Sequence, residues 1–396
     1  MERADRLRIG IIVPPMLPLP PQGYAGTERV VTALSVELHR RGHDVTVFAS
    51  GDSELPCRVV PVVPKALWPA GYRGDVSSYI SLAVARAWQE SDRFDVIHSH
   101  VEGGGFVMAR HCPVPTLSTL HGRLDGHGMP ELIEMFPDIP LVAISESQRR
   151  WSPGANWLAT IHHGLDFADV PFSVDPGRYL LVVGRAAPQK GITEAIELAR
   201  TTGLPLVLAL KVHDRDEEDL YETAIRPAIE NGTVDWRGEV NGTERNRLYA
   251  GALATLMLGA WPEPFGLVAI ESMATGTPVI ARRAGACTET VEHGLTGFLV
   301  DDLQEAALAV SRVAGLERAR IRAYARGRFS VQRMTDAYEG TYRSLVEERP
   351  PSRIAPVGPS AGAISTGASR RPERAPVASD NGASVSALRR QGKIAR

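Results

Sequence analysis

Two carboxylates, Glu263 and Glu271, bracket the segment EPFGLVAIE, which opens on Pro-Phe-Gly and then turns apolar. The pattern predicts a helix that begins near Phe265, with Pro264 just before it and Gly276 at its end. Glu263 then lies in the loop before the helix, and Glu271 lies between one and two turns inside it, about 9 Å along the axis. That separation suits two hydroxyl-bearing parts of one ligand better than one shared proton.

A basic pair, Arg185 and Lys190, flanks the turn between the apolar stretch YLLVVG and the amphipathic stretch GITEAIELARTTG. Cations beside a helix N-terminus favour a phosphate, because the free backbone N–H groups and the helix dipole also attract an anion. The segment lacks GxxxxGK[ST], so it does not support a P-loop, and a basic pair alone is more often ordinary surface. Backbone N–H groups of Phe265, Gly266 and Leu267 would complete an anion site between the two carboxylates. Together these features describe a nucleotide sugar.

The elements that must position these residues are short apolar strands alternating with amphipathic helices. RIGIIV, TERVVTALSVELHRRG and DVTVFA form the first strand, helix and strand, and the series continues through DVIHSH, TLSTLHG and LVAIS. It restarts at YLLVVG, after Pro171, Pro176 and Gly177, and a polar helix is predicted over 216–231. The sequence therefore predicts an α/β protein with two doubly wound, Rossmann-like domains of parallel strands, and a ligand in the cleft between them.

The composition is that of a globular chain, with 396 residues, 43% hydrophobic and 23% charged. A formal charge of −2 gives no reason to expect nucleic acid as a partner. Three widely spaced cysteines, Cys57, Cys112 and Cys287, predict no disulfide framework and fit a reducing cytoplasm. We expect neither a signal peptide nor a transmembrane helix, because no apolar run is long enough.

Residues 350–396 differ from the rest of the chain. They are rich in Pro, Ser, Ala and Gly without an apolar period, which predicts disorder. This tail contains eight Lys or Arg residues and only two acidic residues, Glu373 and Asp380, so it is basic. Two interpretations stay open, a solvated tail or an adhesive arm for acidic lipid or nucleic acid.

In combination, several blocks resemble the retaining glycosyltransferases of family 4, which have the GT-B fold. In the second half these are GRAAPQKG, EPFGLVAIE and AGACTETVEHGLTGFLV, and in the first half PPQGYAGTERVV, FDVIHSH, TLHG and IHHGLD. The likeness extends over roughly residues 7–345. It implies an acceptor-side domain over 1–170, a donor-binding domain over 171–330 and a helix over 331–349 that returns to the first domain.

The resemblance also implies roles for individual residues. Arg185 and Lys190 would neutralise the donor diphosphate, Glu271 would accept from the ribose hydroxyls, and Glu263 would bind hydroxyls of the transferred sugar. His121 of TLHG resembles the family histidine beside the donor sugar, so the catalytic candidates are His121, Glu263, Arg185 and Lys190. The remaining donor-binding candidates belong to the glycine loop QGYAG, the helix start and the segment GEV: Gly26, Phe265, Gly266, Leu267 and Val240.

The implied reaction moves a sugar from a nucleotide-diphosphate sugar to an acceptor hydroxyl. A UDP-sugar is favoured, GDP and ADP stay open, and the acceptor is undetermined among polysaccharide, lipid and small metabolite, with peripheral membrane contact also open. Front-face attack, with the leaving phosphate taking the acceptor's proton, assigns Glu263 to sugar binding rather than to nucleophilic attack. Two alternatives remain, another GT-B enzyme such as a nucleotide-sugar epimerase and a non-catalytic nucleotide-sugar binding protein.

No cofactor and no bound divalent metal are expected. No HExxH motif or cysteine cluster is present, His98 and His100 are expected on opposite faces of a strand, and His162 and His163 are adjacent, so neither pair should chelate easily. Whether His98, His100 or Lys211 contacts substrate stays open. Less distinctive are Ser145, a weak site candidate, Trp261, which is interpreted as packing, and His43, which is interpreted as a surface residue of a turn.

Overall fold

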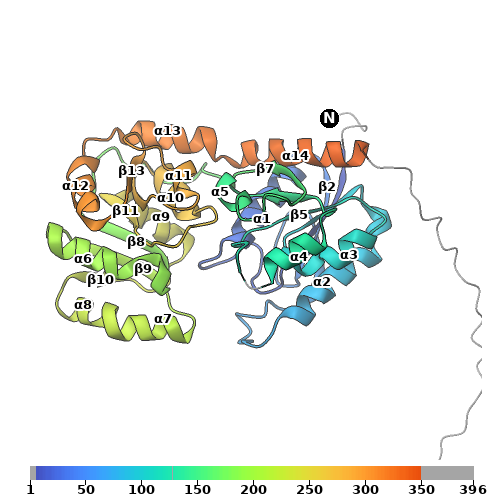
Figure 1. The fold of residues 1–396 in the computed structure, drawn as a ribbon, viewed down its shortest axis with the longest axis horizontal. Helices are drawn as coiled ribbons and strands as arrows, with labels where there is room; N and C mark the ends of the chain where they lie inside the picture. The colour runs from blue at the N-terminus through green and yellow to red at the C-terminus, as the bar shows by residue number, and fades with distance from the viewer. Residues whose placement is uncertain (1–5, 127, 349–396) are drawn as a thin grey trace, which may run out of the picture. The chain divides into compact units, whose positions relative to one another are not determined.

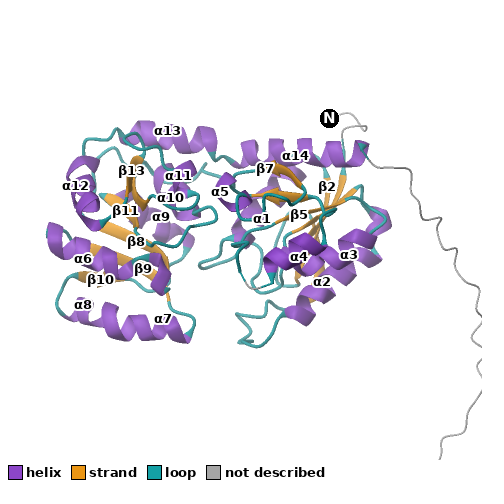
Figure 2. Ribbon diagram, in the orientation of Figure 1, coloured by secondary structure: helices purple, strands orange, loops and turns teal. Residues whose placement is uncertain are grey.

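The computed structural model describes residues 6–126 and 128–348, which contain two parallel β-sheets flanked by helices (Figure 1, Figure 2). The predicted tail at 350–396 lies outside the described residues. Both sheets have the strand reversal of doubly wound folds, so the predicted α/β class with two Rossmann-like halves is confirmed.

The first sheet has seven parallel strands in the order β3-β2-β1-β4-β5-β6-β7. Its strands are β1 (Arg8–Ile12), β2 (Asp44–Ser50), β3 (Arg58–Val63), β4 (Val96–Ser99), β5 (Thr116–Thr119), β6 (Leu141–Ala143) and β7 (Trp157–Thr160). The associated helices are α1 (Thr27–Arg40), α2 (Ser77–Gln89), α3 (Phe106–His111), α4 (Met129–Met135) and α5 (Glu146–Arg149). Sequence periodicity did not reveal the outer strands β3 and β7.

Side chains from both faces of this sheet are buried. Ile9 and Ile11 of β1 pack in one apolar cluster with α1, while Ile12 packs in another with α2. Alternation along a strand explains this split, because successive side chains point to opposite faces. The strands can therefore be apolar on both sides, as expected of a parallel sheet between two helical layers.

The second sheet has six parallel strands in the order β10-β9-β8-β11-β12-β13. Its strands are β8 (Leu180–Arg185), β9 (Leu206–Lys211), β10 (Val234–Trp236), β11 (Ala254–Met257), β12 (Val279–Arg282) and β13 (Gly297–Val300). Its helices are α6 (Ile192–Thr202), α7 (Arg215–Leu220), α8 (Arg226–Glu230), α9 (Gly242–Gly251), α10 (Leu267–Ala274), α11 (Cys287–Thr290), α12 (Leu303–Val313) and α13 (Arg318–Arg328). The helix predicted over 216–231 is divided between α7 and α8 by a π-helical turn at Tyr221–Ile225, and Pro227 lies in the first turn of α8.

The last described helix, α14 (Val331–Glu347), packs against α1 of the first half. Its apolar side buries Val331, Met334, Tyr338 and Tyr342 beside the first sheet. The chain thus returns from the second sheet to the first, and both sheets belong to one compact unit. No helix in the described part of the chain is long and apolar enough to cross a membrane.

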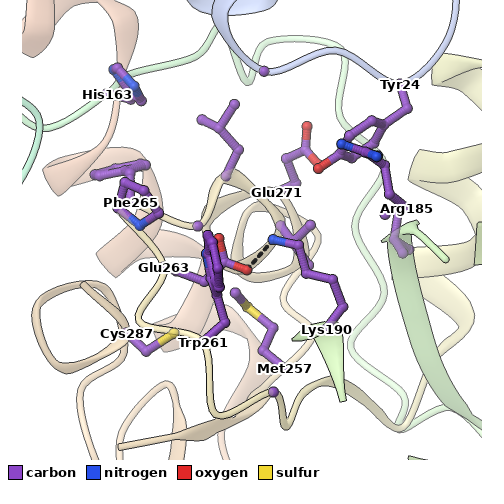
Figure 3. A pocket seen from close by; sticks show the side chains of 18 of the residues that line it. Tyr24, His163, Arg185, Lys190, Met257, Trp261, Glu263, Phe265, Glu271 and Cys287 are labelled. Atoms are coloured by element: carbon purple, nitrogen blue, oxygen red, sulfur yellow. Dashed lines mark hydrogen bonds and ion pairs between the residues drawn. The ribbon is translucent and has the colours of Figure 1, made fainter. Parts of the chain in front are cut away.

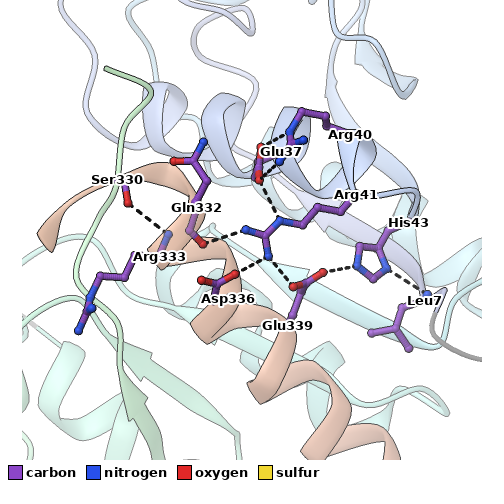
Figure 4. A network of polar contacts seen from close by, with 10 residues as sticks. All are labelled: Leu7, Glu37, Arg40, Arg41, His43, Ser330, Gln332, Arg333, Asp336 and Glu339. Atoms are coloured by element: carbon purple, nitrogen blue, oxygen red, sulfur yellow. Dashed lines mark hydrogen bonds and ion pairs between the residues drawn. The ribbon is translucent and has the colours of Figure 1, made fainter. Parts of the chain in front are cut away.

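A polar network secures α14 to the end of α1 (Figure 4). Arg41 bonds the carboxylates of Glu37, Asp336 and Glu339. His43 is buried, accepts from the Leu7 N–H at 3.1 Å through Nδ1, and lies 2.5 Å from Glu339 through Nε2. The interpretation of His43 as surface is therefore wrong, because α14, far away in sequence, covers the turn.

We predict that Glu339→Ala destabilises the protein by about 1–3 kcal/mol, because it leaves the buried His43 N–H and part of Arg41 without an acceptor. Asp336→Ala is the matched control. The Asp336 side chain is 68% exposed against 15% for Glu339, so its loss should cost less than about 1 kcal/mol. Denaturant midpoints of both variants measure the difference, and equal midpoints would contradict the network's role.

Candidate active site

A large pocket collects side chains from both halves, and its empty space, which includes open solvent, is about 1180 Å³. Its walls come from the segments after β1 and β5 and from the carboxyl ends of β8, β11 and β12. The location agrees with the rule that doubly wound sheets bind ligands at strand reversals.

The pocket gathers nearly all of the predicted site residues, although their roles remain predictions. Those that line it are Gly26, His121, Arg185, Lys190, Glu263, Phe265, Gly266, Leu267 and Glu271. Val240 instead lines a small neighbouring pocket with Tyr24, Lys211 and Glu239. The Tyr24 N–H donates to Glu239 at 2.9 Å, so the GEV segment contacts the glycine loop of the first half.

The helix between the two carboxylates begins later than predicted. α10 starts at Leu267, and Gly266 precedes it with φ +84°, a left-handed conformation that a right-handed helix cannot contain. Phe265 therefore belongs to the loop, where its ring is buried. Glu271 lies about 6 Å along the axis from Leu267, less than the predicted distance because the first turn was placed too early.

An ion pair joins Lys190 to Glu263 across the floor of the pocket (Figure 3). Burial by itself lowers the pKa of Lys190, but the Glu263 carboxylate, together with Tyr24 and Cys287, raises that pKa above its ordinary value. The approach of the two loops requires glycine. A side chain on Gly191, which has φ +73°, would meet the Gly259 nitrogen at 2.3 Å. Lys190 is thus held as a cation beside a carboxylate at the end of β8.

The guanidinium of Arg185 is oriented by acids of the segment after β9. Its Nε donates to Glu217 at 2.5 Å and an Nη donates to Asp214 at 2.6 Å. Glu217 is buried and also accepts from the His213 N–H at 2.7 Å. Parallel register places Lys211 of β9 directly beside Arg185 of β8, so both cations lie at the same sheet edge.

Glu271 faces cations that the sequence analysis did not identify. Arg29 of α1 pairs with one carboxylate oxygen, Arg245 lies 3.7 Å from the other, and the Tyr249 hydroxyl donates to that second oxygen at 3.0 Å. Burial lowers the pKa of Arg29 to about 9, and the nearby Arg245 adds to the effect. Arg29 lies in the block PPQGYAGTERVV, but there it reads as one polar residue of an amphipathic helix. Glu271 is therefore shared between the two halves.

His121 belongs to a cluster of imidazoles. Its Nε2 lies 2.8 Å from Nδ1 of His100, and its ring stacks on His163 with centroids 5.2 Å apart. The rings of His98 and His100 are 3.9 Å apart. The expectation that they point to opposite faces is wrong, because residues i and i+2 of a strand share a face.

Burial lowers the pKa of His121 to about 3, so its imidazole is neutral near pH 7. The backbone at His121 is fixed by Glu102, whose Oε1 accepts from the N–H groups of His121 at 2.9 Å and Gly122 at 3.1 Å. Burial raises the pKa of the Glu102 carboxyl to about 7, although these two donors act in the opposite direction.

Ser145, the weak site candidate, and Trp261, interpreted as packing, both have defined contacts. Ser145 caps α5 and donates to the Pro264 carbonyl at 2.7 Å, so it ties the first half to the loop before α10. Trp261 lines the pocket, and the guanidinium of Arg123 lies over its ring, 4.1 Å from the centroid. Within the described residues, no group of three or more His, Cys, Asp or Glu side chains is arranged to hold a metal ion.

Comparison with known proteins assigns both halves. Residues 24–167 match the model described as Glycosyltransferase Family 4, and residues 168–328 match Glycosyl transferases group 1. The chain belongs to the group 1 glycosyltransferases. It is accordingly a transferase with the GT-B fold, as the sequence predicted.

Individual relatives agree with this assignment. The chain is 28% identical to the glycogen synthase of Mycobacterium tuberculosis over 372 residues, which cover 81% of this chain and 89% of the relative. Among solved structures, AviGT4, a glycosyltransferase involved in avilamycin A biosynthesis, is 25% identical with a TM-score of 0.66, covering 87% of this chain and 99% of that one. The Anabaena protein HepE, solved in complex with UDP-glucose, is 18% identical with a TM-score of 0.67 over 86% of this chain and all of that one, which shows the shared fold.

The Glu102 carboxyl makes a pH-dependent prediction. The folded protein keeps this proton up to about pH 7, whereas the unfolded chain loses it near 4.5. Between these values the unfolded state binds fewer protons, so this group's contribution to stability falls as pH rises. Glu102→Gln cannot ionise, and its melting temperature relative to wild type should therefore rise from about pH 5 to about pH 8. The exposed Glu131→Gln is the control; the same trend in both variants would contradict the assignment.

Proposed function

We propose that this glycosyltransferase moves a sugar, with retention of anomeric configuration, from a nucleotide-diphosphate sugar to an acceptor hydroxyl. A UDP-sugar is the favoured donor, with GDP- and ADP-sugars as the alternatives to test. One observation carries the proposal: cationic Lys190 and Arg185 converge with the carboxylates Glu263 and Glu271 in one pocket. The cations suit a diphosphate and the carboxylates suit hydroxyl groups.

The proposed reaction breaks the bond between the sugar's anomeric carbon and the donor phosphate oxygen. Negative charge grows on the leaving diphosphate, and in this proposal Lys190 and Arg185 stabilise it by exchanging carboxylate partners for phosphate oxygens. The acceptor oxygen forms its bond to the anomeric carbon on the face that the phosphate leaves, and its proton passes to a phosphate oxygen. This front-face route gives retention without a protein nucleophile.

In this proposal Glu263 binds hydroxyls of the transferred sugar. Its carboxylate already pairs with Lys190, which stabilises the carboxylate and lowers its nucleophilicity. Neutral His121 contributes hydrogen bonding beside the sugar rather than a formal positive charge. Glu271 accepts hydrogen bonds from the ribose hydroxyls. Its carboxylate must then bind the ribose as well as Arg29 and Tyr249.

The proposed donor class draws support from the family assignment and from the fold shared with a UDP-glucose-bound protein. We further propose that no divalent ion resides in the site, since Lys190 and Arg185 supply the positive charge that the leaving group needs. The acceptor remains open among polysaccharide, lipid and small metabolite, with peripheral membrane contact a further question for lipid acceptors.

A thermal-shift panel of UDP-, GDP- and ADP-sugars tests the donor, because a ligand at 100 times its dissociation constant stabilises by about 2.7 kcal/mol. The stabilising donor is then followed by NMR of its anomeric proton, with and without EDTA. We expect slow hydrolysis or transfer to a product of the same anomeric configuration, unchanged by EDTA. An inverted product would contradict front-face retention, and isomerised donor without transfer would indicate an epimerase.

Lys190→Ala and Arg185→Ala should each lower kcat/KM by more than about tenfold, because each removes a charge that stabilises the leaving diphosphate. Arg320→Ala, which removes an exposed cation of α13, serves as the control and should leave turnover unchanged. Near-normal kcat/KM in both pocket variants would refute the diphosphate assignment.

A further inference from the structure

We infer that His100 is a positioning residue for His121, and that its ring holds His121 as the tautomer protonated at Nδ1. The role in turnover rests on the proposed function; the tautomer itself does not. The proposal stands on three observations. The two rings are in contact, the surroundings of His100 are rigid, and the choice of tautomer decides whether the unpaired buried N–H belongs to His100 or to His121.

The contact is direct. Nδ1 of His100 and Nε2 of His121 are 2.8 Å apart, a normal hydrogen-bond length. His121 lines the pocket, whereas His100 is not among the described residues that line it and is only 1% exposed. His100 can therefore act on a ligand only through His121.

His100 is itself held from several sides. Its N–H donates to the Ile12 carbonyl at 2.9 Å, which fixes it beside β1. Its ring packs on His98, whose Nδ1 lies 2.7 Å from the Tyr342 hydroxyl and whose Nε2 lies 2.7 Å from the Thr119 hydroxyl. The Tyr338 hydroxyl, 3.0 Å from that of Thr119, completes the group. Tyr338 and Tyr342 of α14 thus help to fix the His98 ring against which His100 packs.

His121 has little freedom left once His100 is fixed. Glu102 accepts from the backbone N–H of His121, His163 stacks on one face of the His121 ring, and His100 contacts its Nε2 atom. A ring confined in this way keeps one rotamer. The remaining variable is which of its two nitrogens carries the proton.

A neutral imidazole has one donor and one acceptor, so the contact between the two rings permits two arrangements. If His121 donates, the His100 proton lies on Nε2, a buried atom without a partner among the described residues and sealed away from the pocket. If His100 donates through Nδ1, the unpaired N–H belongs instead to Nδ1 of His121, on a ring that lines the pocket. A buried N–H without any acceptor is costly, and only the second arrangement places it on a residue beside the ligand.

The test combines a measurement on the wild type with two variants. Long-range ¹H–¹⁵N spectra of the histidine-labelled full chain report the tautomer of His121, and the spectrum of His121→Asn assigns its signals. We expect a protonated Nδ1. A His121 protonated at Nε2 overturns the inference, whatever the protein's activity.

For the role in turnover, His100→Phe keeps a buried ring and removes the hydrogen bond, while His100→Asn restores a short donor close to the position of Nδ1. We expect His100→Phe to lower kcat about tenfold or more with donor KM changed less than about threefold, and His100→Asn to recover most of kcat. The exposed His111→Phe is the control for loss of a histidine.

Wild-type kcat in His100→Phe, or no recovery in His100→Asn although it melts like wild type, overturns the positioning role. If His100→Phe does not fold, Tyr342→Phe replaces it, since it removes only the hydroxyl beneath His98, and an unchanged kcat then counts against the role. Should the wild type transfer no sugar from any donor, the proposed function fails, while the tautomer spectrum still decides the inference about His100.

Discussion

The carboxyl ends of parallel strands lie at one edge of a sheet, and the site depends on that constraint. Arg185 and Lys211 end adjacent strands in register, and the loops after β8 and β11 deliver Lys190 and Glu263 to the same edge. In the first sheet, β4 and β5 deliver His100 and His121 in the same way. Residues separated by tens of positions therefore meet because each follows a strand, not because each has its own local signal.

Within the pocket, opposite charges are already paired. Lys190 holds Glu263, and Arg29 and Arg245 approach Glu271. Buried charges left alone would be expensive, so this pairing holds the charged side chains in place before a substrate arrives. In the proposed function, a diphosphate and sugar hydroxyls would exchange partners with these groups. The same pairing brings Arg29 of the first half to Glu271 of the second.

The fold class could be predicted from the sequence, and nearly all of the predicted site residues line the pocket, because both predictions rest on local patterns. Short apolar runs that end at glycines mark the inner strands. Arg185, Glu263 and His121 each lie in a short, recognisable stretch of sequence. The start of α10 was misplaced because the left-handed φ of Gly266 has no unique sequence signature. His43 was misjudged because a helix some 290 residues away covers it, as its contact with Glu339 shows.

The sequence by itself determined that this chain forms two doubly wound halves and that cations and carboxylates follow the ends of strands. It could do so because secondary structure, and the residues that end it, are encoded locally. Only the tertiary structure decided how these groups are partnered. Arg29 with Glu271, Glu217 with Arg185, and His100 with His121 are contacts between side chains far apart along the chain. Their formation depends on the register of strands and the packing of α1 and α14, which no single segment specifies. Long-range packing therefore fixes the charge and orientation of the groups that local sequence merely supplies.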